Sequence, residues 1–140
     1  MHNSDDRTGP DYVKVEYSRS ELTGRIIAAA KAVHLEIGPG FPELVYQRAL
    51  AIELAAGGLS FTREYEMEIN YRGQKVGEKR VDFFVEGIMV EIKARSVLED
   101  IHCVQALSYL KASGAEIGLL LNFGAKKLEI KRLIHTPKPR

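Results

Sequence analysis

The segment Val81–Lys93, with the sequence VDFFVEGIMVEIK, determines how the chain is expected to fold. It contains two apolar runs on either side of Glu86-Gly87, a dipeptide suited to a tight turn. The pattern predicts two strands, Val76–Val85 and Ile88–Lys93, joined as a hairpin by a two-residue loop. A loop this short makes the strands antiparallel and fixes which residues face each other.

The predicted register places two acidic residues side by side. Counting outward from the turn puts Asp82 directly opposite Glu91, with Cβ atoms about 4.5–5.5 Å apart. Lys93 lies two residues beyond Glu91 and therefore points to the same face. Facing carboxylates repel each other unless a cation lies between them. Two alternatives are open here: a site for a hard divalent ion, Mg²⁺ or Mn²⁺, or a solvated strand face on which Lys93 neutralises one carboxylate.

The chain before the hairpin is predicted to be mainly helical. Residues 1–17 are expected to form a loose leader with a short edge strand at Tyr12–Tyr17. Ser18–Glu21 has the S-x-x-E spacing of a helix-capping box, so a helix is expected to begin there and to end at Gly38–Gly40. Pro42 suits the first turn of a second helix, which ends at Gly57-Gly58.

The remaining elements complete a mixed sheet. Glu64–Tyr71 alternates apolar and polar residues and is predicted to join the hairpin in an antiparallel three-stranded meander. A helix over Ser96–Ala112, opened by a second capping box, leads to a buried strand at Ile117–Phe123 and a more polar strand at Leu128–Ile134. The predicted class is α/β: a three-layer fold with a mixed central sheet, a crossover helix and further strands, flanked by helices.

Length and composition limit the classes of protein that need be considered. The 140 residues suffice for one domain, predicted to span 18–135, followed by a basic tail at 136–140. The single cysteine, Cys103, excludes an intrachain disulfide, a cysteine-based zinc site and a cysteine-ligated iron–sulfur cluster. No apolar run reaches the ~18 residues of a membrane span, and the N-terminus does not resemble a signal peptide. The expected location is the cytoplasm.

Charge is unevenly distributed along the chain. The net charge is +1, but residues 1–70 hold 7 basic and 11 acidic residues, whereas residues 71–140 hold 13 basic and 8 acidic residues. The basic half is compatible either with contact to a polyanion or with an ordinary solvated surface.

Three further polar residues are candidates for a site. Glu43, in the first turn of the second predicted helix, is either a helix-dipole acid or a third acid that reaches the carboxylate pair. Gln105 and Tyr109 lie on one face of the third predicted helix, either as part of a solvated rim or at the edge of an active site. In the second case Gln105 would hold a water or a phosphate oxygen, and Tyr109 would bond a carboxylate or stack on a base.

Taken together, these motifs resemble those of a known nuclease group. Asp82 followed by Glu91–Lys93 is similar to the PD-(D/E)XK signature of restriction-endonuclease-like nucleases, with Val81 where the signature name has proline. Gln105–Tyr109 resembles the Q-x-x-x-Y motif of the RecB-type and lambda-exonuclease-type branches. Gly40–Tyr46 matches the G-x-x-E-x-x-Y motif of the GxxExxY family in the same superfamily. The resemblance covers roughly residues 20–135 in the expected order.

The resemblance implies a restriction-endonuclease-like fold and Mg²⁺-dependent cleavage of DNA phosphodiester bonds. It assigns the metal to Asp82 and Glu91, helped by Glu43 and the backbone carbonyl of Ile92. By the same resemblance, Lys93 positions or activates the attacking water, and Gln105 and Tyr109 support the site. Relatives with an iron–sulfur cluster need four cysteines, which this chain lacks.

The sequence therefore predicts a metal-dependent DNA nuclease. Basic residues from the second half of the chain are the expected phosphate contacts: Lys79, Arg80, Arg95, Lys126, Lys127, Lys131 and Arg132. So small a domain has little surface with which to enclose DNA, so a homodimer or a partner protein is plausible. Two alternatives remain: a catalytically silent nucleic-acid-binding or assembly module of the same fold, and a nuclease that cleaves RNA.

Overall fold

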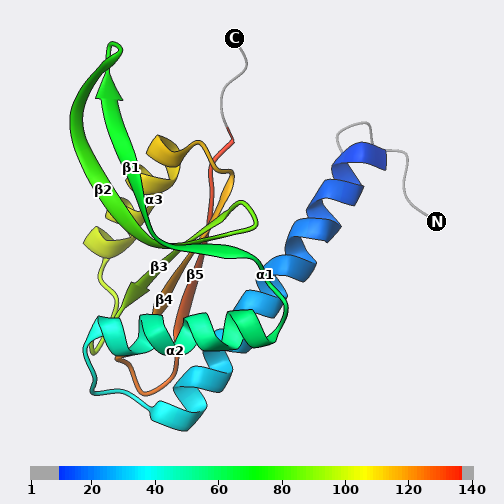
Figure 1. Cartoon of the computed structure of the whole chain (residues 1–140), viewed down its shortest axis with the longest axis vertical. Coiled ribbons are helices and arrows are strands. Elements are labelled where there is room, and N and C mark those ends of the chain that lie inside the picture. The colour runs from blue at the N-terminus through cyan, green and yellow to red at the C-terminus, as the bar shows by residue number, and fades with distance from the viewer. Residues whose placement is uncertain (1–9, 137–140) are drawn as a thin grey trace.

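The computed structural model of the chain describes residues 10–136. Three helices and five strands form three layers, with α1 and α2 on one face of a central sheet and α3 on the other (Figure 1). In chain order the elements are α1 (Pro10–Ile37), α2 (Glu43–Ala56), β1 (Phe61–Tyr71), β2 (Gln74–Val85), β3 (Ile88–Lys93), α3 (Asp100–Ser113), β4 (Ile117–Asn122) and β5 (Glu129–Ile134).

The sheet has the mixed topology that the sequence predicts. Its strand order is β1-β2-β3-β4-β5, and every neighbouring pair is antiparallel except β3 and β4. Parallel neighbours need a long crossover connection, which α3 provides. The predicted two-residue loop between β2 and β3 is confirmed, and both Glu86 and Gly87 have the positive φ that such hairpin turns require.

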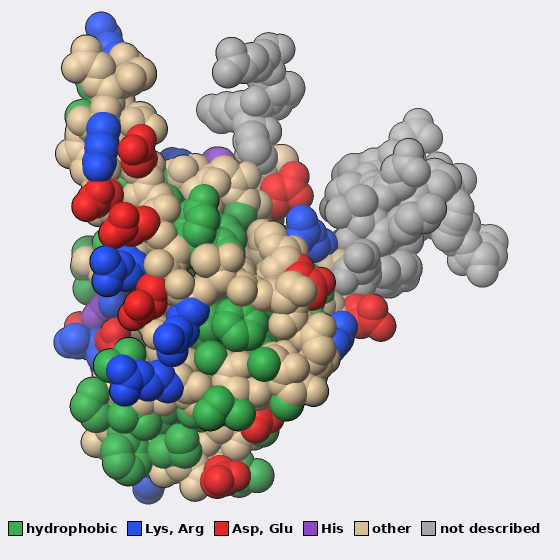
Figure 2. Space-filling model, in the orientation of Figure 1, with side chains coloured by type: hydrophobic (Ala, Val, Ile, Leu, Met, Phe, Trp, Pro, Cys, Tyr) green, Lys and Arg blue, Asp and Glu red, His purple; other side chains and the backbone are tan. Residues whose placement is uncertain are grey.

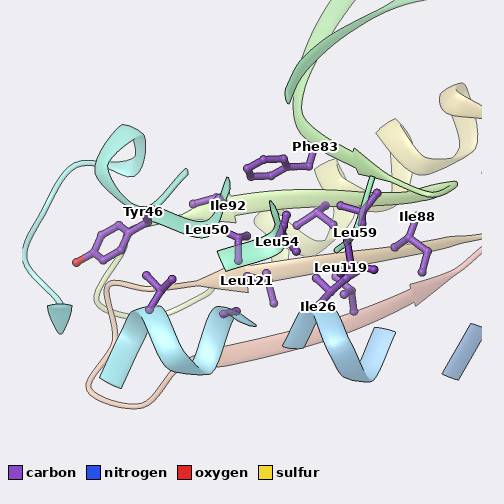
Figure 3. Close-up of a cluster of buried hydrophobic side chains, with 14 of the residues drawn as sticks. Ile26, Tyr46, Leu50, Leu54, Leu59, Phe83, Ile88, Ile92, Leu119 and Leu121 are labelled. Carbon is purple, nitrogen blue, oxygen red and sulfur yellow. The ribbon is translucent and has the colours of Figure 1, made fainter. Parts of the chain in front are cut away.

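The larger hydrophobic core lies between the sheet and the two N-terminal helices. Tyr46, Leu50 and Leu54 of α2 and Ile26 of α1 meet side chains from β2, β3 and β4 in this layer (Figure 3). A smaller cluster lies under α3 and consists of Met67, Val81, Met89 and Leu110. Within residues 10–136, no helix combines the length and apolarity needed to cross a bilayer.

The outer part of β1 and β2 forms a two-stranded ribbon that extends beyond the other strands (Figure 1). Within β2, only Phe83–Val85 pair with β3, so the segment Gln74–Val81 has β1 as its only partner in the sheet. Asp82 lies between this segment and Phe83, the first residue of β2 that pairs with β3.

Two predicted helix starts are wrong. α1 begins at Pro10, so the predicted edge strand at Tyr12–Tyr17 is helical and the capping box at Ser18–Glu21 lies inside the helix. Proline is well suited to a first helical turn, and extending an existing helix is much easier than nucleating one, which overrides a local strand-like pattern. Residues 1–9 of the predicted leader and residues 137–140 of the predicted tail lie outside the described residues.

α3 begins at Asp100, four residues after the predicted start at Ser96. Its capping box is formed by Glu99 and His102, and the Glu99 backbone N–H donates to His102 Nδ1 (3.0 Å). The preceding segment is held by the sheet, since the Leu98 backbone N–H donates to Glu129 Oε1 (2.8 Å). This tertiary bond competes with the predicted cap at Ser96.

Candidate active site

Asp82 and Glu91 face each other in the structure, as the sequence predicts. The β2–β3 ladder ends with Phe83 opposite Val90, and side chains continue the pairing beyond that point. The Ile92 backbone N–H donates to Asp82 Oδ2 (2.8 Å), and the Asp82 backbone N–H donates to Glu91 Oε1 (3.2 Å). Each carboxylate thus accepts a backbone hydrogen bond from the other strand.

The backbone of β2 is irregular at Asp82. Residues two apart in a strand normally share a face, yet Val81 belongs to the cluster under α3 and Phe83 to the cluster under α1 and α2. On β1, Glu64 lies opposite this point with φ of 55°, a conformation that is uncommon outside glycine. The side chain of Asp82 therefore projects at the bend where the strand changes face, within reach of α2.

Gln47 of α2 is the residue that reaches Asp82 from the helical layer. Its Nε2 donates to Asp82 Oδ1 at 2.7 Å, and the side chain is only 5% exposed. Its Oε1 has no hydrogen-bond partner, the one such buried side-chain atom among the described residues. The sequence pattern did not single out Gln47. The available signal was a polar residue inside the buried stripe formed by Tyr46, Leu50 and Leu54.

Glu91 is the more buried of the two acids, with 4% of its surface exposed. Burial raises the pKa of Glu91 to about 7, and the neighbouring Asp82 carboxylate acts in the same direction. Lys79 opposes this rise in pKa, since its Nζ lies 3.5 Å from Glu91 Oε2. Glu91 consequently titrates near neutral pH instead of near its ordinary pKa of 4.5.

Lys79 joins the acid pair to α3. Its Nζ lies 4.8 Å from the centre of the Tyr109 ring, within the range of a cation–π contact. Lys79, a predicted phosphate contact, thus lies against Glu91, and Tyr109 contacts that lysine.

Lys93 is the last residue of β3 and is partly buried. Its backbone carbonyl accepts a hydrogen bond from Phe123 N–H (2.8 Å). The next turn is held by Asn122, whose Oδ1 accepts from Arg95 N–H and whose Nδ2 donates to the Arg95 carbonyl. A Cβ atom at Gly124 would clash with the backbone of Arg95, so this close approach requires glycine. These bonds fix the backbone that carries Lys93.

Tyr46 fixes the loop that leads into α2. Its buried hydroxyl donates to the Gly38 carbonyl (2.6 Å) and accepts from Phe41 N–H (3.2 Å), while its ring stacks on Phe123 at 4.9 Å. The final tyrosine of the G-x-x-E-x-x-Y motif therefore anchors the loop that precedes Glu43.

Two predicted site residues are exposed, unlike Glu91 and Gln47. Glu43 is exposed in the first turn of α2, and Gln105 is exposed on α3. Residues 10–136 contain no group of three His, Cys, Asp or Glu side chains placed to hold a metal. The helix therefore brings Gln47, one turn further along than Glu43, to Asp82.

The predicted phosphate contacts are distributed over several surfaces. Arg80 pairs with Glu66 (3.2 Å), and Arg132 Nη1 donates to Thr23 Oγ1 (2.7 Å). Lys126, Lys127 and Lys131 are exposed on the β4–β5 loop and on β5, whereas Lys79 lies on β2, on the other side of β3 and β4 in the sheet order. In the face shown in Figure 2, lysine and arginine side chains are interspersed with acidic ones along the β1–β2 ribbon.

The atoms gathered at the acid pair suit a hard divalent ion. The donors are the carboxylates of Asp82 and Glu91 and the unpartnered amide oxygen of Gln47, all of them oxygen atoms. Burial and the neighbouring Asp82 carboxylate both disfavour the charged form of Glu91, so the pair favours an added cation.

Comparison with known proteins agrees with this chemistry. The family profile of the PD-(D/E)XK nuclease superfamily matches residues 20–133, from the middle of α1 to near the end of β5. No curated protein and no solved structure matches the chain. The mixed five-stranded sheet with helices on both faces agrees with the restriction-endonuclease-like fold expected of that superfamily.

Proposed function

This chain belongs to the PD-(D/E)XK nuclease superfamily, and on that premise we propose that it is a metal-dependent nuclease that hydrolyses phosphodiester bonds in DNA. The observation that carries the proposal is the pair of carboxylates at the end of the β2–β3 ladder. Asp82 and Glu91 are held against each other by backbone bonds, in spite of their mutual repulsion. A divalent ion bound between the two carboxylates would offset that repulsion.

The proposed metal ligands are Asp82, Glu91 and the backbone carbonyl of Ile92, with Glu43 contributing from α2. The ion is Mg²⁺ or Mn²⁺, and when bound it would polarise the phosphate and lower the pKa of a bound water. Gln47 and the Ile92 N–H each donate to one oxygen of Asp82 and so hold its carboxylate in one orientation.

Lys93 is proposed to position or activate the attacking water. Its backbone carbonyl accepts a hydrogen bond from Phe123, and Asn122 holds the nearby Arg95 backbone. Gln105 is exposed on α3 and is proposed to contact the substrate backbone, whereas Tyr109 supports the site through Lys79. These roles follow the Q-x-x-x-Y branch of the superfamily.

Within the superfamily, we assign the chain to the GxxExxY group. Support comes from Tyr46, whose hydroxyl and ring fix the loop that leads to Glu43 and Gln47. We expect the seven basic residues to contact phosphates and therefore to give affinity without sequence specificity. The proposed setting is the cytoplasm, where Cys103 would stay reduced, and a second copy or a partner protein would help to enclose the DNA.

The proposal is tested by incubating the protein with labelled linear, circular and single-stranded DNA and with RNA, in Mg²⁺, Mn²⁺ or EDTA. Wild type is expected to cut DNA only with a divalent ion, and Lys93→Ala is expected to lose the cutting. Lys111→Ala, which removes an exposed lysine of α3, is the matched control and is expected to cut normally.

Two results would contradict the proposal. Normal DNA binding without any cleavage would favour a silent binding or assembly module. Cleavage of RNA alone would make the protein a ribonuclease with the same metal chemistry.

A further inference from the structure

The amide group of Gln47 is only half used by the protein. Its Nε2 donates to Asp82 Oδ1, but its Oε1 is buried without a partner. A buried acceptor left without a hydrogen bond destabilises a protein, because it loses its bonds to water and gains none in return. An apolar side chain of similar size would fill the same space in α2 without that loss, so packing alone does not explain a glutamine here.

The chemistry of Asp82 determines which way the amide points. An ionised carboxylate only accepts hydrogen bonds, so the NH₂ group of Gln47 must face Asp82 and the carbonyl oxygen must point elsewhere. The two amide atoms share one carbon, so Oε1 remains close to the Asp82 carboxylate. It is therefore a candidate ligand for an ion that Asp82 binds.

The other oxygens of the site already have donors. Asp82 Oδ1 and Oδ2 accept from Gln47 and Ile92, and Glu91 Oε1 and Oε2 face the Asp82 N–H and Lys79. Each carboxylate oxygen keeps a further lone pair, whereas Gln47 Oε1 has no donor at all. An amide carbonyl is a normal ligand of a hard divalent ion.

We propose that Gln47 is a residue of the metal site: its NH₂ group positions Asp82, and its Oε1 binds the divalent ion. This inference rests on the proposed function, since it needs that ion between Asp82 and Glu91. It also assigns the main contribution of α2 to Gln47 instead of Glu43. The two residues are one turn apart on the same helix stripe, but Gln47 is buried against the pair and Glu43 is exposed.

The test measures binding of Mn²⁺ and Mg²⁺ alone to the full chain, by calorimetry and by the Mn²⁺ spin-resonance signal, without any nucleic acid. Gln47→Met removes both polar atoms at similar volume and is expected to weaken metal binding by about 10–100-fold. Gln47→Glu keeps an oxygen ligand but loses the NH₂ donor, and it is expected to bind Mn²⁺ at least as tightly as wild type. Gln74→Met, at the exposed start of β2, is the control and is expected to bind like wild type.

The two Gln47 variants separate metal binding from a purely structural role. Equal loss of affinity in Gln47→Met and Gln47→Glu would mean that only the NH₂ donor to Asp82 matters, and would overturn the inference. Wild-type affinity in Gln47→Met, with loss of binding in Asp82→Ala, would overturn it too while the metal-dependent function stands. Absence of Mn²⁺ binding by wild type would overturn both.

Discussion

The face of the sheet that packs against α1 and α2 holds a cluster of sixteen buried hydrophobic side chains, whereas the cluster under α3 has four. The first layer includes stacked and edge-on aromatic pairs such as Tyr46 with Phe123 and Phe61 with Phe83. The second layer includes the polar connection from Tyr109 through Lys79 to Glu91. One face therefore supplies most of the packing, and the other combines a small core with charged groups.

The two acids belong to different sides of this division. Asp82 is fixed by α2 through Gln47, and Glu91 is connected to α3 through Lys79 and Tyr109. We infer that the two layers act on different carboxylates: the well-packed layer orients Asp82, and the α3 layer shifts the pKa of Glu91. Four measurements test that division.

The largest difference is expected from matched cavities in the two layers. Leu50→Ala on α2 and Leu110→Ala on α3 both truncate fully buried leucines. Such changes lower the free energy of unfolding by about 2.7–5 kcal/mol, depending on how far the surroundings collapse. We expect Leu50→Ala near the upper end and Leu110→Ala near the lower end, measured by urea unfolding. Equal losses would show that the two layers are equally rigid.

The next effect concerns the proton on Glu91. Its pKa is about 7 in the folded protein against an ordinary 4.5, so the folded state binds more protons than the unfolded state between those values. Stability without divalent ions is therefore expected to fall as pH rises through that window, by about 3 kcal/mol in total. Glu91→Gln should remove this fall.

The measurement is urea unfolding in EDTA from pH 5 to pH 8. The quantity to compare is the difference in free energy of unfolding between Glu91→Gln and wild type, which should grow in favour of the variant as pH rises. Glu53→Gln, which neutralises an exposed acid of α2, is the control. A difference that does not change with pH would show that Glu91 is not the group that takes up the proton.

A smaller effect is expected at the connection to α3. Lys79→Met removes the cation that faces both Glu91 and the Tyr109 ring. Because Lys79 counteracts the rise in the pKa of Glu91, the midpoint of the pH dependence should move upward. At pH 8 the variant should lose about 1 kcal/mol of stability, with Lys111→Met unchanged. If the midpoint does not move, Lys79 has no effect on the pKa of Glu91.

The smallest effect is expected from Tyr109→Phe. Lys79 lies over the ring of Tyr109, and a phenylalanine ring preserves that contact. Stability and DNA cleavage should both stay close to wild type. A large loss of cleavage with unchanged stability would show that the hydroxyl itself meets the substrate, and would give the α3 layer a direct chemical role.

The parts of the site that follow from local rules could be predicted from the sequence. The two-residue turn at Glu86-Gly87 fixes the hairpin register, and the register brings Asp82 opposite Glu91. The order of helices and strands and the mixed sheet also follow from periodicity and spacing. These features depend on residues that are close together in the chain, which is why a pattern is enough.

The helix starts show where local rules fail. The strand-like pattern at Tyr12–Tyr17 is overridden by the helix that extends from Pro10. The capping signal at Ser96 is overridden because Glu129 and Asn122 bind the backbone of the segment before α3. In the second case the competing partners are more than twenty residues away along the chain.

The sequence by itself determined that this chain forms a mixed α/β sheet with two facing carboxylates and a lysine at the end of a hairpin. Only the tertiary structure decided which residues surround them. A helix stripe contains both Glu43 and Gln47, but the docking of α2 on the sheet brings Gln47 to Asp82. The bend at Asp82 and the crossover of α3 likewise bring Lys79 between Glu91 and Tyr109. Helix docking depends on how the whole core packs, and no short stretch of sequence contains that information.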